Sequence, residues 1–306
     1  MWHGALVVFR FELRRTMTLN RVAIWLLLVL FPVFIVSVMK YYEPEIEGEI
    51  PRDAFNSRQV RVQRGLAWGE EEHDGDGDES GPAPHPRGSA AEAEPNPMDP
   101  IWGFVFFGLI PEVITLFGLL LWVPPLVHAE LEGRTWIYLA VRPRGRVSVL
   151  LGKYLTAITW TALAGWASTT ACVLIAQPGC ALRLWGTMVA LVTLACLAYG
   201  AIYSLIGVWL HRRAMAIAVS YTLIFEFLVS FIPAVINKFT VQYRLRNLLF
   251  TWMDWWDLVP IEASTLFLGS ERAWVHVLIL CGIVVAVLGV AAQVIQRREY
   301  ATIAEA

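Results

Sequence analysis

The chain has 306 residues, of which 57% are hydrophobic and only 16% are charged, and its formal net charge is −2. The high mean hydropathy of +0.55 and the shortage of charges exclude an ordinary soluble domain, in which charged residues make up about a quarter of the chain. The sequence therefore predicts an all-α integral membrane protein with a single transmembrane domain over residues 1–306.

The first predicted element is an amphipathic helix within residues 1–21. Its apolar stripe at helical spacing consists of Leu6, Phe9, Leu13 and Met17. Its arginines lie off that stripe, at Arg10, Arg14, Arg15 and Arg21. We expect such a helix to lie in the membrane interface as an elbow before the first span, with its apolar face toward lipid and its arginines toward phosphates.

Six apolar stretches are each long enough to cross a hydrocarbon core of about 30 Å. They are residues 22–39, 101–127, 150–176, 184–210, 214–236 and 274–296. We expect the first to be retained rather than cleaved as a signal, because the residues that follow it lack a small-residue cleavage site. The sequence thus predicts six transmembrane helices.

Residues 40–100 form the predicted loop between the first two spans, and they are rich in Asp and Glu. From Ala67 to Met98 this acidic loop cannot bury enough apolar surface to offset its ordering entropy, so we expect disorder there. The alternating Asp and Gly residues near Asp74 resemble a calcium loop but lack the downstream bidentate Glu. A solvated acidic linker is the favoured interpretation.

The segment between the second and third spans is charged and broken by proline, so it must face water. Its charged residues within 128–155 are Glu130, Glu132, Arg134, Arg142, Arg144, Arg146 and Lys153. Because Lys and Arg accumulate on the cytoplasmic side, this segment and both termini are predicted to be cytoplasmic, with the acidic loop outside. A short charged connection at the mouth of two spans is typical of a docking surface for a soluble partner.

Residues 237–273 interleave tryptophans with acidic residues, as in Trp252, Asp254, Trp255 and Trp256. Trp prefers the depth of the membrane interface. This pattern predicts an amphipathic hairpin in the outer interface, which can re-enter the membrane only where other parts of the protein cover its backbone.

Two carboxylates fall inside predicted spans, Glu112 and Glu226. A charge at the bilayer centre costs at least about 2.5–3.5 kcal/mol, so each must face a protein interior or a wet cavity, or be protonated. One interpretation is a protonated, structural Glu that is hydrogen-bonded to Tyr199, Tyr203 or Tyr221. The other is that both carboxylates line a substrate path.

The search for catalytic and cofactor motifs finds little. The Gly145 and Gly152-Lys153 pattern has the wrong spacing for a phosphate loop. The histidines form no pair at metal-ligand spacing, and no Cys-x-x-Cys occurs. We therefore expect no enzyme activity, no metal and no cofactor on this chain.

The order of these elements resembles that of permease subunits in the type-2 ABC exporter family. The family's inner segment reads Glu-x-Glu-x-Gly-Thr, then Leu-Leu-x-x-Pro, a basic residue, and Leu-Gly-Lys. Matching positions here are Glu130, Glu132, Thr135, Leu139, Arg142, Pro143, Arg146, Leu151, Gly152 and Lys153. Glycine stands at 133 rather than 134, where this chain has Arg134, so the local turn differs.

The resemblance implies a permease of the plasma or inner membrane that couples ATP hydrolysis to export. ATP and Mg would bind a separate cytoplasmic ABC ATPase, whose groove would receive a coupling helix at residues 129–141. The implied ATPase-coupling residues are Glu130, Glu132, Arg134, Thr135, Arg142 and Pro143. A second permease copy, identical or different, would complete the pathway, and no nucleic-acid partner is expected.

The alternative function is a proton-coupled secondary transporter that uses Glu112 and Glu226, although the inverted repeat typical of that class is not visible. The resemblance does not select a substrate. Relatives move lipids, polysaccharides, drugs or peptides, and the branch linked to maturation of multi-copper enzymes is a candidate for this chain.

Overall fold

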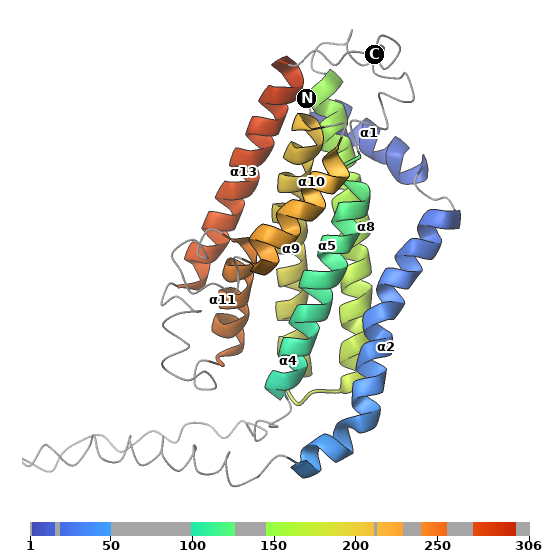
Figure 1. Ribbon diagram of the computed structural model, residues 1–306, viewed down its shortest axis with the longest axis vertical. Helices are drawn as coiled ribbons and strands as arrows, with labels where there is room; N and C mark the ends of the chain where they lie inside the picture. Colours follow the sequence, from blue (N-terminus) through green and yellow to red (C-terminus); the bar gives the residue numbers. More distant parts are fainter. Residues whose placement is uncertain are drawn as a thin grey trace, which may run out of the picture.

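The structure, a computed structural model, describes residues 2–15, 19–49, 99–125, 145–210, 213–228, 240–255 and 272–297. Within these ranges every regular element is a helix, and the helices form an elongated bundle (Figure 1). The predicted all-α membrane fold is confirmed: within the described residues, five helical stretches are long and apolar enough to span a membrane. The predicted count of six is not confirmed, because the fifth predicted span, 214–236, corresponds to a shorter apolar helix, Ala214–Leu228.

The centre of the bundle is a pair of long helices, α8 (Gly145–Ala176) and α9 (Ala181–Trp209). Small residues allow the two to pack closely, and a Cβ added at Gly165 would lie 2.6 Å from Val192 Cγ1. They are joined by a turn, residues 177–180, in which Gln177 adopts a left-handed backbone with φ of 48°. The buried Asp99 holds this turn by accepting a hydrogen bond from the Gly179 N–H at 2.9 Å.

The turn also carries Cys180, which lies outside the spans, and its reactivity can be predicted. Burial, and then the nearby Asp99 carboxylate, raise the pKa of the Cys180 thiol to about 11. Thiolate is the reactive form, so maleimide labelling should rise about tenfold per pH unit between pH 7 and 9. Asp99→Asn should accelerate labelling at a fixed pH, because the negative charge is removed while an accepting oxygen remains.

The measurement uses a chain in which the other cysteines, Cys172, Cys196 and Cys281, are replaced by Ala. A labelling rate that is flat from pH 7 to 9, or unchanged by Asp99→Asn, would contradict this account of the turn.

Two helices flank the central pair, α2 (Leu19–Glu49) on α8 and α13 (Ala273–Arg297) on α9 (Figure 1). Both expose large apolar side chains, such as Leu27 at 68% and Val285 at 74%, as expected where lipid rather than protein surrounds a helix. Helix α2 continues to Glu49, ten residues beyond the predicted end of the first span. The rest of the predicted acidic loop, up to residue 98, lies outside the described residues.

The N-terminal helix α1 (Trp2–Arg15) packs across the start of α8. Ala5 and Val8 of α1 lie against Gly152, and Lys153 Nζ lies 3.9 Å from Glu12 Oε1. This packing turns Leu6 and Phe11 outward, where they are 52% and 64% exposed. The exposed apolar face thus shares Leu6 with the predicted stripe but also includes Phe11, because part of the helix surface is used against α8. Helix α1 is described as far as Arg15, and α2 begins at Leu19.

Both ends of the bundle can be identified by which helices meet there. Val147 of α8, Val208 of α9 and Ile295 of α13 belong to one buried cluster beside α1, and Arg146 Nη1 donates to the Gln296 carbonyl at 3.4 Å. We call this the α1 end. The opposite, turn end holds residues 177–180 and the start of α4 (Asp99–Phe107) (Figure 1).

Two stretches depart from ordinary α-helix. Helix α4 leads into the π-helix η1 (Gly108–Ile114) and then α5 (Thr115–Trp122). Helix α10 (Ala214–Tyr221) leads into a second π-helix, η2 (Thr222–Leu228). Within η1, Pro111 has no N–H to donate and cannot continue the regular hydrogen-bond ladder. Single π-helical turns inside membrane helices are found frequently at functional sites.

The last element is α11 (Val241–Met253), which is capped by Thr240 and ends at Asp254 with φ of 60°. Nearly all its side chains are buried, and it packs against α9 and α13. The predicted interfacial hairpin, 237–273, is described only for residues 240–255. In that part the chain forms a helix inside the bundle rather than a piece lying on its surface.

Candidate functional site

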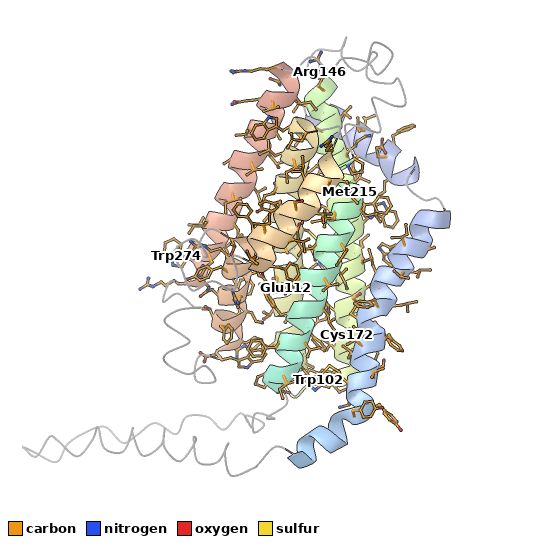
Figure 2. All side chains as sticks on the ribbon, viewed as in Figure 1. Trp102, Glu112, Arg146, Cys172, Met215 and Trp274 are labelled. Atoms are coloured by element: carbon orange, nitrogen blue, oxygen red, sulfur yellow. The ribbon has the colours of Figure 1, made fainter. Side chains whose placement is uncertain are left out.

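The two intramembrane carboxylates lie in the two π-helices, Glu112 in η1 and Glu226 in η2. Glu112 lies along the length of the bundle between Trp102, near the turn end, and Met215 (Figure 2). The structure brings both carboxylates to one residue at the start of α11. The Gln242 side chain donates to Glu112 Oε1, and the Gln242 backbone N–H donates to Glu226 Oε2 at 3.2 Å.

Glu226 is enclosed by donors and is only 1% exposed. Tyr199 of α9 donates its hydroxyl to Oε2 at 3.0 Å, and Tyr221 of α10 donates to Oε1 at 3.2 Å. A buried carboxyl group without such partners would be costly. The N-terminus of a helix adds a favourable environment for negative charge, and Glu226 accepts from the first turn of α11.

Two of the three tyrosines predicted as partners therefore contact Glu226. The third, Tyr203, lies 2.6 Å from the Thr222 hydroxyl instead, and its ring stacks on Tyr199 with centroids 6.3 Å apart. Through these contacts α9 binds two residues of η2, Thr222 and Glu226.

Glu112 is more accessible than Glu226, being half-buried. Besides Gln242, its carboxylate interacts electrostatically with the Arg246 guanidinium, one turn further along α11. The same helix holds Arg244, which is buried and lies 3.2 Å from Nδ1 of His276 on α13. Helix α11 thus presents Gln242 and Arg246 to Glu112 of η1, and Arg244 to His276 of α13.

We call the group formed by Glu112, Glu226, Gln242, Tyr199 and Tyr221 the carboxylate cluster. Sequence reasoning identified its acidic members and both tyrosines. It missed Gln242 and the neighbouring Arg246, because the tryptophans downstream placed this segment at the surface. The available signal was the alternation of polar Gln242, Arg244 and Arg246 with apolar Val241 and Leu245.

The residues implied in ATPase coupling, Glu130, Glu132, Arg134, Thr135, Arg142 and Pro143, lie outside the described residues. Only the end of the motif is described. There Gly152 is the site where α1 approaches α8, and Lys153 is the partner of Glu12. Within the described ranges, no group of three or more His, Cys, Asp or Glu side chains could hold a metal ion.

Lipid-facing apolar helices around a buried polar cluster define a multi-pass membrane protein with ionisable groups in its interior, the arrangement typical of transporters. Residues 6–300 match the model of the ABC-2 family transporter proteins. The chain belongs to this family, whose members are the membrane-spanning permeases of ABC transporters rather than enzymes. The match is to the family as a whole and does not single out the copper-maturation branch. Comparisons with curated proteins and with solved structures gave no match.

Proposed function

We propose that the chain is the permease subunit of an ATP-driven ABC exporter. The observation that carries the proposal is the family match over residues 6–300. In this function a separate cytoplasmic ATPase binds ATP and Mg, and this chain converts closure of the ATPase pair into movement of its spans. A second permease copy, identical or different, completes the pathway across the plasma or inner membrane.

The proposed coupling helix lies in residues 129–141, between the end of α5 and the start of α8. Helix α8 begins at the α1 end, where α13 also ends (Figure 1). The excess of Lys and Arg in the segments on this side supports a cytoplasmic orientation. In this orientation both termini are cytoplasmic, and the turn joining α8 to α9 faces outward.

Charge reversal in the coupling segment tests the proposed function. The variant Glu130→Arg/Glu132→Arg/Arg134→Glu should lose the ATPase on co-purification, or retain it with hydrolysis uncoupled from transport. The reason is that these groups would lie in the ATPase groove, where like charges would face one another. Insertion into the membrane should be unchanged.

A matched control reverses Arg213 and Arg297, which are exposed at the α1 end outside the coupling segment, and should retain the ATPase. Normal assembly and transport after reversal of all three coupling residues would overturn the proposal. So would the isolation of a native complex that contains no ATPase.

A second candidate function is supported by the carboxylate cluster. Glu112 and Glu226 are joined through Gln242, so they could form a relay in a proton-coupled secondary transporter. We favour the ATP-driven function because the family match covers nearly the whole chain.

A further inference from the structure

Near its start, helix α11 has a residue that contacts both π-helices. Its first turn supplies three polar contacts: Thr240 caps the helix by accepting from the Tyr243 N–H at 3.2 Å, and Gln242 binds both Glu112 and Glu226. The two glutamates are 114 positions apart in the chain and belong to different helices. One residue of a third helix therefore joins η1 to η2.

The two contacts of Gln242 come from different parts of the residue. Its backbone N–H is fixed by the helix, so the bond to Glu226 ties η2 to the axis of α11. Its side-chain amide reaches in another direction to Glu112, which ties η1 to the same point. Because a π-helix has a less regular hydrogen-bond ladder than an α-helix, such external contacts strongly influence where each segment lies.

We propose that Gln242 is a positioning residue that holds Glu112 and Glu226 in register and makes η1, η2 and the start of α11 move as one unit. The inference rests on the proposed function in one respect, that the spans must shift relative to one another during transport. The half-buried Glu112 is the member that an arriving polar group can reach, and any group that takes the place of the Gln242 amide releases η1 from α11.

Asn247 provides a second buried amide on α11 for comparison. It lies on the same helix, is fully buried, and donates from Nδ2 to the Tyr243 carbonyl at 2.8 Å, a contact within α11 itself. Gln242 and Asn247 are thus two buried amides on one helix, and Gln242 is the one that binds Glu112 and Glu226.

The test is hydrogen exchange of the full-length chain in lipid nanodiscs, which needs neither the ATPase nor a substrate. Gln242→Met keeps the side-chain volume and removes the amide. We expect exchange to rise about two- to tenfold in residues 108–114 and also in 222–228, the factor for losing one buried hydrogen bond. Exchange rises in residues 222–228 as well, because the start of α11 has then lost its bond to Glu112 and is held by Glu226 alone. The control Asn247→Leu should raise exchange in neither segment.

Exchanging the two side chains tests the hydrogen bond between residues 112 and 242 separately from their packing. Glu112→Gln combined with Gln242→Glu restores an amide-to-carboxylate hydrogen bond with donor and acceptor reversed. This double variant should exchange within about twofold of the unchanged chain, whereas Gln242→Glu alone, which removes the donor and sets two carboxyl groups face to face, should not. If Gln242→Met fails to accumulate in the membrane, the double variant is compared with Gln242→Glu instead.

A rise confined to residues 108–114, an equal rise in Asn247→Leu, or a double variant no better than Gln242→Glu alone would each overturn the inference. None of these results bears on the proposed function, which is tested separately by charge reversal at residues 130, 132 and 134.

Discussion

Replacing Glu226 by Leu should destabilise the protein by about 3 kcal/mol or more. The substitution removes the acceptor of three donors at once: the hydroxyls of Tyr199 and Tyr221, and the N–H of Gln242. Each buried donor left without an acceptor costs about 1–3 kcal/mol, and the site is too enclosed for water to replace the carboxylate. The loss should appear as a lower unfolding temperature of the purified protein and less protein in the membrane.

The matched control is Glu226→Gln, which keeps the shape and one accepting oxygen but cannot titrate. If the carboxylate cluster serves packing in an ATP-driven exporter, Glu226→Gln should retain most of the stability and transport that Glu226→Leu loses. A proton relay predicts the reverse order of importance, with transport lost in Glu226→Gln even when ATP is present. Transport that persists without ATP, collapses with the proton gradient and is lost in Glu226→Gln would establish the secondary-transporter function.

The fold class could be predicted from sequence because the signal is large and local. Spans such as 150–176 and 184–210 are long uninterrupted apolar stretches, and the structure places α8 and α9 there. The ends were less predictable: α2 runs on to Glu49 and α8 begins at Gly145. Polar residues can extend a membrane helix beyond the hydrocarbon, and hydropathy does not register that extension.

The acidic members of the candidate site could also be predicted, because a buried carboxylate is expensive in a membrane wherever it falls. The way in which the site is organised could not be predicted. Gln242 is neutral and carries no such signal, and its partners are 16 and 130 positions away in sequence. The π-helices are equally hidden, since Pro111 marks a disturbance in η1 whereas no proline occurs within Thr222–Leu228.

The packing of α1 illustrates a third limit. Periodicity correctly indicates an amphipathic helix, but it cannot tell which part of the surface meets lipid and which meets another helix. That choice depends on Gly152, where the missing side chain admits the α1 backbone. The close approach turns Ala5 inward and Leu6 outward, although Leu6 is the more apolar of the two.

Gly152→Leu should therefore separate α1 from α8. A Cβ at this position would lie 2.7 Å from Val8 Cγ1 and 3.0 Å from the Ala5 carbonyl oxygen, so the α1 backbone itself would have to move. Overpacking of this kind costs about 1–3 kcal/mol, which exceeds the gain of up to about 1 kcal/mol from replacing Gly within a helix. The ion pair between Lys153 and Glu12 would be pulled apart by the same movement.

The matched control is Gly186→Leu in α9, where an added Cβ meets nothing within 4 Å. There only the helix-propensity gain remains, so Gly186→Leu should leave stability equal or slightly higher while Gly152→Leu lowers it. Unfolding temperature measures the difference, and faster proteolysis or hydrogen exchange of residues 2–15 locates it in α1. Equal behaviour of the two variants would show that α1 is not held against α8 at Gly152, because a real contact between backbone and Cβ at 3.0 Å cannot be relieved by a side-chain rotation.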